Sequence, residues 1–230
     1  YEGMAPLWAP NTDGINPDSS RHVLIERCDV ESGDDHVAIK SGMNAFARAH
    51  SPEFQTANVT VRHNTFRVGM GVSVGSETAG GIRGVRVHHN TFLGDGSFCV
   101  ALHVKSAPHR GGTIEDVAFT HNRVHGTSAL MRLGRFGEAR EPPTEYAPTA
   151  LRTLAWAHNV YEPRLQTSKP VRSKFMCPGR CAGIRLENNS LPPKARWQCV
   201  DVQVDGSQQR GMERSTCLGA TKSARGKRKT

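Results

Sequence analysis

The chain has 230 residues, 37% of them hydrophobic, and a formal net charge of +9. This length predicts one domain rather than two, and no apolar stretch reaches the roughly 18 residues that a membrane span needs. Five of these positive charges lie in a C-terminal tail without acids, at Lys222, Arg225, Lys227, Arg228 and Lys229. The rest of the chain has a net charge of +4. The charge therefore favours an acidic partner only modestly, and we expect no nucleic-acid or membrane partner.

Two polar segments near the start of the chain concentrate three carboxylates. Asp13 is followed by Gly14, and the pair Asp34 and Asp35 comes 21 residues after Asp13. Each segment leads into a short apolar run, 23–25 or 37–39, and so resembles a polar turn before a buried strand. One interpretation is that Gly-Asp-Asp is only a solvated turn, because Gly and Asp are favoured in turns for backbone reasons alone. Carboxylates on a rigid strand scaffold also suit glycoside hydrolysis, in which one carboxyl protonates the leaving oxygen and another activates water.

A nine-residue repeat favours the second interpretation. Five segments align without gaps: 22–30, 58–66, 84–92, 116–124 and 183–191. All are apolar at positions two, four and nine, and all but the first carry Asn at position seven. They start 36, 26, 32 and 67 residues apart, the last gap being about two periods. A period of this size indicates a solenoid.

A second strand is expected after each of the first three repeats, at 37–40, 71–75 and 100–105. One strand-turn-strand unit per period, with few helix signals, predicts an all-β fold, a right-handed parallel β-helix with coils about 4.8 Å apart. We expect the repeated asparagines to adopt a left-handed turn conformation and to link each coil to the next through their side-chain amides. They are Asn64, Asn90, Asn122 and Asn189.

Stacked coils would gather residues that are far apart in the sequence. Asp13, the Asp34 and Asp35 pair, segment 69–71 and segment 103–105 all lie near the start of a second strand, so we expect them in one column on an outer face. The coil spacing plus side-chain reach predicts carboxyl groups roughly 6.5–9.5 Å apart, which leaves room for a water and favours inversion.

Four ordered motifs make the chain similar to the polygalacturonases of glycoside hydrolase family 28. They are Asn11-Thr12-Asp13-Gly14, Gly33-Asp34-Asp35, the segment 69–77 and His103-Val104-Lys105. The resemblance covers residues 11–125 and returns at 194–217, where it is similar to plant-type members. It implies hydrolysis of α-1,4-linked galacturonan, the acidic backbone of pectin, without metal or organic cofactor. It implies further that Asp34 is the general acid, that Asp13 and Asp35 position and deprotonate water, and that Lys105 binds a substrate carboxylate.

Two residues depart from the family pattern. Met70 replaces the usual His, and His103 replaces the usual Arg. Met cannot donate a hydrogen bond, and an imidazole cannot reproduce the bidentate fork of Arg on a sugar carboxylate. We expect reduced activity or an altered substrate, and we expect restoring both family residues to raise turnover. The alternative is a galacturonan-binding protein of the same fold with little turnover. A lyase or adhesin is disfavoured, since lyases need a calcium site.

The remaining cysteines and histidines carry structural signals. Six cysteines in a chain of this length are typical of a secreted protein, here expected in the cell wall as a monomer. We expect the pairs Cys199 with Cys217 and Cys177 with Cys181, and Cys28 and Cys99 as apolar side chains or a third bridge. No His and Cys spacing fits a zinc site. His36 either shifts the protonation of the acids or packs inward, and the others predicted to flank turns are His63, His88, His89 and His121.

The expected organisation is one β-helix domain over 1–218 and a basic disordered tail over 219–230. Family members have several coils before the first acid motif, so we expect coils missing before Tyr1. Segment 127–175 breaks the repeat and is either an irregular insertion or a set of divergent coils. Endo or exo attack, and galacturonan or rhamnogalacturonan as substrate, depend on loops that the sequence leaves open.

Overall fold

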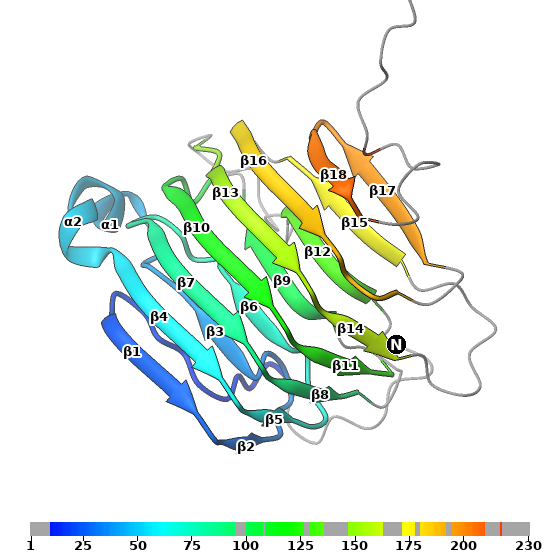
Figure 1. Cartoon of the computed structure of the whole chain (residues 1–230). Helices are drawn as coiled ribbons and strands as arrows, with labels where there is room; N and C mark the ends of the chain where they lie inside the picture. Colours follow the sequence, from blue (N-terminus) through cyan, green and yellow to red (C-terminus); the bar gives the residue numbers. More distant parts are fainter. Residues whose placement is uncertain are drawn as a thin grey trace, which may run out of the picture.

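The computed structural model describes residues 10–94, 100–107, 109–126, 129–135, 147–162, 172–177, 180–191, 195–209 and Cys217. Its strands form three parallel sheets that wind around a common core (Figure 1). Successive strands of the chain pass from one sheet to the next, and each strand pairs with its counterpart one coil further on. The fold is a right-handed parallel β-helix, as the repeat predicted.

The seven-stranded sheet has one strand from each repeat. In spatial order it contains β1 (Arg21–Glu26), β4 (Thr56–Arg62), β7 (Ile82–His88), β10 (Thr113–Thr120), β13 (Ala150–Ala157), β16 (Arg180–Glu187) and β18 (Val204–Gln208). Val59 is the Cα partner of Val85, and Val85 is the Cα partner of Val117. All three side chains are buried in the core, so the predicted stacking of equivalent positions is confirmed.

Two further sheets complete each coil. The five-stranded sheet contains β2 (Asp29–Val30), β5 (Thr65–Phe66), β8 (Thr91–Leu93), β11 (Arg123–His125) and β14 (Val160–Glu162). The six-stranded sheet contains β3 (Val37–Ile39), β6 (Val72–Val74), β9 (Val100–Ser106), β12 (Ala129–Arg135), β15 (Arg172–Met176) and β17 (Arg196–Val200). The expected second strands are thus β3, β6 and β9.

Two short helices interrupt the coils between β3 and β4, α1 (Ala45–Ala49) and α2 (Ser51–Phe54). They lie at one edge of the solenoid in Figure 1. Asn44 caps α1, because its side chain accepts a hydrogen bond from the Ala47 amide. Neither helix approaches the length of a membrane span, and the described residues contain no other helix that does.

The described parts of segment 127–175, residues 129–135, 147–162 and 172–175, contain strands of regular coils. Strands β12, β13 and β14 continue the three sheets, and β15 begins within it. Residues 153–161 even match the repeat, with Leu154, Trp156, Asn159 and Tyr161 at positions two, four, seven and nine. This coil thus follows the same pattern as the others, and Trp156 is its largest buried side chain.

The asparagine ladder is confirmed and is longer than predicted. Asn64 Nδ2 donates to Asn90 Oδ1 at 3.0 Å, and the same bond continues through Asn122, Asn159, Asn189 and finally Gln209. The predicted left-handed backbone belongs instead to the residue before each asparagine, for example His63, His89 and His121, with φ of 55–57°. The side-chain amide of each asparagine lies along the stack, so that its Nδ2 donates to the Oδ1 of the asparagine in the next coil.

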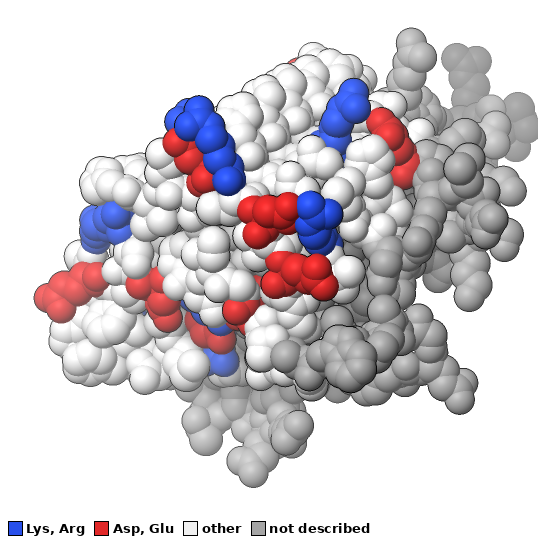
Figure 2. Space-filling model, turned by 90° about the horizontal axis from the view of Figure 1, so that it is seen from below, with Lys and Arg blue, Asp and Glu red and all other residues white. Residues whose placement is uncertain are grey.

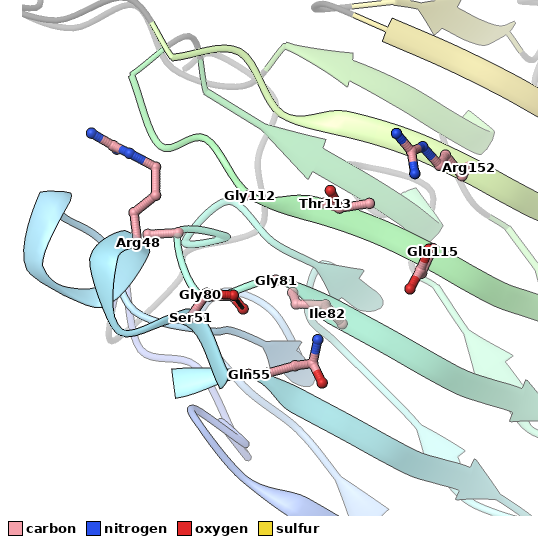
Figure 3. Close-up of a pocket in the computed structure, with 11 residues that line it drawn as sticks. Arg48, Ser51, Gln55, Gly80, Gly81, Ile82, Gly112, Thr113, Glu115 and Arg152 are labelled. Atoms are coloured by element: carbon pink, nitrogen blue, oxygen red, sulfur yellow. Dashed lines mark hydrogen bonds between the residues drawn. The ribbon is translucent and has the colours of Figure 1, made fainter. Parts of the chain in front are cut away.

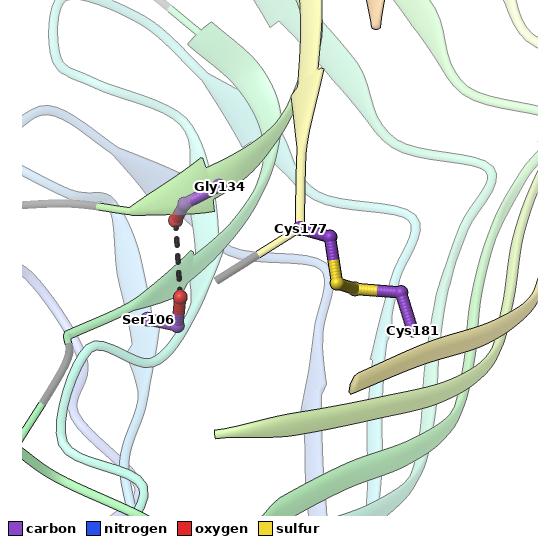
Figure 4. The surroundings of a disulfide bond; sticks show 4 residues. All are labelled: Ser106, Gly134, Cys177 and Cys181. Atoms are coloured by element: carbon purple, nitrogen blue, oxygen red, sulfur yellow. Dashed lines mark hydrogen bonds between the residues drawn. A yellow bond between two sulfur atoms is a disulfide. The ribbon is translucent and has the colours of Figure 1, made fainter. Parts of the chain in front are cut away.

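Two disulfides close the C-terminal coils. Cys177 is bonded to Cys181, with a Cα separation of 5.9 Å, and Cys199 to Cys217, with a Cα separation of 4.8 Å. Figure 4 shows the first beside β12, where the Ser106 hydroxyl donates to the Gly134 carbonyl. Both predicted pairs are present. Cys28 is a free cysteine, whereas Cys99 lies outside the described residues.

Candidate active site

The three predicted acids are brought together at the entrance of the six-stranded sheet. The turn that carries Asp13 pairs with the turn before β3, since the Gly14 amide donates to the Asp35 carbonyl and the Asp34 amide donates to the Thr12 carbonyl. A Cβ at Gly14 would lie 2.7 Å from the His36 carbonyl oxygen, so only glycine permits this approach. One carboxylate oxygen from each acid lies within 4.8 Å of the others.

Coil spacing predicted carboxyl groups roughly 6.5–9.5 Å apart, the range of inverting glycosidases. The distance of 4.8 Å joins the nearest carboxylate oxygens and not whole carboxyl groups, so the separation stays a prediction. The hydrogen bonds between the two acid turns bring the three side chains together.

Asp35 is the most buried acid of the cluster, with its side chain 5% exposed. Its Oδ1 accepts a hydrogen bond from the Ser73 hydroxyl at 2.7 Å, and its Oδ2 accepts one from Lys105 Nζ at 2.5 Å. Burial raises the pKa of Asp35, although the Lys105 ammonium and the Ser73 hydroxyl both act to lower it. With both oxygens engaged, Asp35 is a fixed acceptor and not a mobile proton donor.

Asp13 has the opposite balance. Burial acts to raise its pKa, but the hydrogen bond and charge of Lys40, at 2.8 Å, outweigh that effect, so that the pKa of Asp13 lies below its usual value. Asn16 donates a further hydrogen bond to the same oxygen at 3.0 Å. Asp13 is therefore held as a carboxylate, the form that can orient and deprotonate a water.

Asp34 is partly buried and has a different environment. Its Oδ1 accepts the backbone amide of Asp35 at 2.8 Å, and within the described part of the chain no side chain donates to its carboxylate. Its carbonyl accepts the Met70 amide at 2.8 Å, which places segment 69–71 beside the acid turn as predicted. Of the three acids, Asp34 has the carboxyl group that is least engaged by other side chains.

The same three carboxylates are the group of potential metal ligands found among the described residues. Two of them are already hydrogen-bonded to ammonium groups, Asp13 to Lys40 and Asp35 to Lys105. These two lysines supply positive charge inside the cluster, and each ammonium occupies one lone pair that a metal would need.

His36 packs inward, which decides between its two interpretations. It is fully buried and stacks on Phe66 with ring centroids 5.1 Å apart. Its Nδ1 accepts the Gly71 amide at 3.0 Å, and its Nε2 lies 3.0 Å from the Val68 carbonyl, so the ring is neutral with its proton on Nε2. Burial lowers the pKa of His36 to about 4. The ring ties adjacent coils together under the acid turn.

The structure also places cationic residues beside His103 that sequence reasoning missed. In the six-stranded sheet, His103 is the Cα partner of Ser73 on one side and of Arg132 on the other, and Arg132 is the partner of Lys174. The core residues Met131 and Leu133 flank Arg132, so its side chain lies on the outer face. No repeat was recognised in 127–175, so the signal that could have revealed Arg132 was the alternation from residue 129 to 133.

A separate hollow lies near the starts of β7 and β10 (Figure 3). It has a volume of about 350 Å³, and Arg48, Arg152 and Glu115 are among its lining residues. None of the predicted site residues lines it. The face seen in Figure 2 carries acidic and basic side chains interspersed. Glu115 is the one acid among the described residues that line the hollow, so we place carboxylate chemistry at the acid cluster and not there.

Comparison with known proteins agrees with this geometry. The family model described as Glycosyl hydrolases family 28 matches residues 4–137. The chain belongs to this family. It is 28% identical over 209 residues to a probable polygalacturonase of Vitis vinifera, which covers 87% of this chain and 41% of that protein. It is 34% identical over 116 residues to an endo-polygalacturonase of Pectobacterium carotovorum subsp. carotovorum, covering 50% of this chain and 26% of that protein.

A solved structure with the same fold is an exopolygalacturonase from Thermotoga maritima. The two superpose with a TM-score of 0.58 at 24% identity, over 86% of this chain and 45% of the other. The chain therefore spans less than half the length of these relatives.

Proposed function

We propose that this chain carries the catalytic centre of a polygalacturonase that hydrolyses α-1,4-galacturonosyl linkages of pectin. The observation that carries the proposal is the cluster of Asp13, Asp34 and Asp35 in a family 28 β-helix. As the family resemblance implies, we expect no metal or organic cofactor. The expected setting is extracellular, in the cell wall, where the two disulfides would persist.

In the proposed reaction, Asp34 gives its proton to the glycosidic oxygen as the bond from that oxygen to the anomeric carbon breaks. A water held by Asp13 and Asp35 attacks the anomeric carbon, and its proton passes to this pair of carboxylates. Asp34 suits the donor role because side chains leave it unengaged, and Asp13 suits the acceptor role because Lys40 keeps it ionised. General acid catalysis of this kind contributes on the order of 10²–10⁴ in rate.

Inversion stays a prediction that rests on the spacing expected between the carboxyl groups. Inversion of an α-linkage gives a β-anomer as the first product, whereas retention gives the α-anomer. Proton NMR of the reducing end during the first minutes of hydrolysis, before mutarotation, distinguishes the two. An α-anomeric first product would mean that one of the closely spaced acids acts as a nucleophile.

Substrate carboxylates are proposed to bind along the outer face of the six-stranded sheet. Arg132 supplies positive charge beside the buried His103 on the next strand, and Lys105 supplies it two residues further along the strand of His103. Arg132 offers the bidentate fork that His103 lacks, one coil further from the acids. Met70 contributes its backbone to the acid turn and an uncharged side chain next to it.

The second candidate function is galacturonan binding with little turnover, which Met70 and His103 favour. Release of reducing ends from polygalacturonate, measured on a protein that contains this chain, separates the two. Hydrolysis supports the enzyme. Retention on a polygalacturonate column without release of reducing ends supports the binding protein.

A further inference from the structure

A column of histidines lies on the outside of the solenoid, where the seven-stranded sheet turns into the five-stranded sheet. His63, His89, His121 and His158 occupy position six of successive repeats, with φ of 55–57°. Neighbouring rings have centroids 5.4, 5.2 and 5.0 Å apart. This turn is not the one that carries the acids, which precede β3, so the column belongs to a different part of the surface.

His88 departs from the regular column and meets His89 directly. The Nδ1 atoms of the two rings lie 2.8 Å apart, and the rings are nearly perpendicular, at 87°. Without a ligand, one nitrogen must carry a hydrogen that it donates to the other, because two bare lone pairs at this distance would repel. The two Nδ1 atoms therefore face each other across the gap between the rings.

The separation of these nitrogens matches two adjacent ligands of one metal ion. Bonds of about 2.0–2.1 Å that meet at a right angle place their nitrogens roughly 2.8–3.0 Å apart, whereas a tetrahedral angle separates them by about 3.3 Å. Right angles are typical of tetragonal Cu²⁺ and Ni²⁺ with nitrogen and oxygen ligands, and Cu²⁺ binds such sites most tightly. We propose that His88 and His89 form a surface site for a tetragonal divalent ion, with Cu²⁺ preferred and water at the remaining positions.

Access and protonation are compatible with this site. His89 is exposed and His88 is partly buried, so an ion reaches the pair from solvent. Burial, reinforced by neighbouring positive groups, lowers the pKa of both rings, which favours the neutral form that binds a metal. The nearest fixed cation in the same row, Arg62, is held by Glu26 at 2.8 Å.

The neighbouring histidine provides a matched control. His121 stacks on His89 with an angle of only 4° between the planes. The lone pairs of a ring nitrogen lie in the ring plane, so parallel rings stacked in this way cannot direct their nitrogens at one ion. His121→Asn therefore removes an exposed imidazole from the column without removing a ligand.

The chain itself offers tolerated replacements for both ligands. Asn188 occupies position six of the last repeat with φ of 46°, which makes His89→Asn compatible with the turn. Thr120 is the Cα partner of His88 one coil further on, which makes His88→Thr compatible with the strand. Neither residue belongs to the proposed catalytic machinery, so hydrolysis of polygalacturonate without added metal is expected to be unchanged in both variants.

The test is titration of the full chain with Cu²⁺, followed by calorimetry and by electron paramagnetic resonance. We expect a signal with two coordinated nitrogens. Losing even an outer partner of a ligand weakens metal binding about 10–100-fold, so His89→Asn and His88→Thr should each lose at least tenfold in affinity, and His121→Asn less than about twofold. A signal from the unaltered protein without paired nitrogens would overturn the site whatever the variants do. Equal weakening by His121→Asn would also overturn it.

Discussion

Arg132 lies directly beside His103 in the six-stranded sheet, as its Cα partner one coil further from the acids. The family pattern has an Arg where this chain has His103, so the guanidinium has not been lost from the outer face but lies on the next strand. Compared with an Arg at position 103, Arg132 carries its positive charge one coil further on, about 4.8 Å along the sheet. We expect this shift to move the subsite that binds a substrate carboxylate by the same step.

Arg132→Ala tests that subsite. A charge-assisted pair to a uronate contributes roughly 1.5–3 kcal/mol, so KM for polygalacturonate should rise about ten- to a hundredfold, with a smaller change on methyl-esterified pectin. Steady-state kinetics on both substrates measures the difference. Arg83→Ala on the seven-stranded sheet is the control, and equal effects of the two variants would show that Arg132 acts only through net charge.

His103→Arg tests whether the family residue can simply be restored. From the sequence, this change together with Met70→His was expected to raise turnover. In the structure His103 is 4% exposed, and burial together with the Lys105 and Arg132 charges keeps its pKa well below the usual value. A permanent charge at that place costs several kcal/mol, so we expect a lower urea midpoint than in the neutral variant His103→Gln. An Arg variant as stable as the original and more active would contradict this.

The fold was largely predictable because its signals are periodic. Apolar positions two and four of the repeat predicted the stacked valines, and one Asn per period predicted the ladder. The coil with Asn159 escaped notice because the segment around it is rich in Pro, Arg and Ala. Arg132 was missed for the same reason, since a residue can be assigned to a face of the sheet only after its strand has been recognised.

The candidate site was predictable in composition but not in geometry. The order of the motifs brought Asp13, Asp34 and Asp35 together, but the hydrogen bonds between the two acid turns decide their separation. The inward packing of His36 depends on Val68, Gly71 and Phe66. Such contacts are set by how the coils lie on one another, for which a single turn in the sequence gives no sign.

His36→Gln tests the buried imidazole through pH. The folded protein disfavours protonation, with a pKa of about 4 against 6.5 for the free ring. The unfolded chain therefore binds one more proton between these values, and stability is lost as pH falls through this window, by up to about 3 kcal/mol. Urea unfolding from pH 7 to pH 4 should show a shallower loss in His36→Gln. The exposed His121→Asn is the control, and identical slopes for all three proteins would refute the assignment.

Asn122→Ala tests the ladder. The side chain donates to the Val87 carbonyl at 3.0 Å and to Asn159 Oδ1 at 2.9 Å, and its own Oδ1 accepts from Asn90. Several buried groups would lose their partners, so we expect a loss of roughly 2–4 kcal/mol in the free energy of unfolding. Asn58→Gly is a matched control on the surface, because Gly84 occupies the equivalent repeat position with positive φ. A loss no larger than in that control would mean that water replaces the ladder.

The central claim is that Asp34 is the proton donor for cleavage of galacturonan, and the rate of Asp34→Asn tests it most directly. The substitution keeps the size of the side chain and removes the transferable proton. In a protein that contains this chain, release of reducing ends from polygalacturonate should fall on the order of 10²–10⁴-fold, with polymer binding retained. Asp18→Asn, on an exposed acid outside the cluster, should stay near the original rate. An Asp34→Asn protein as fast as the original would contradict the account.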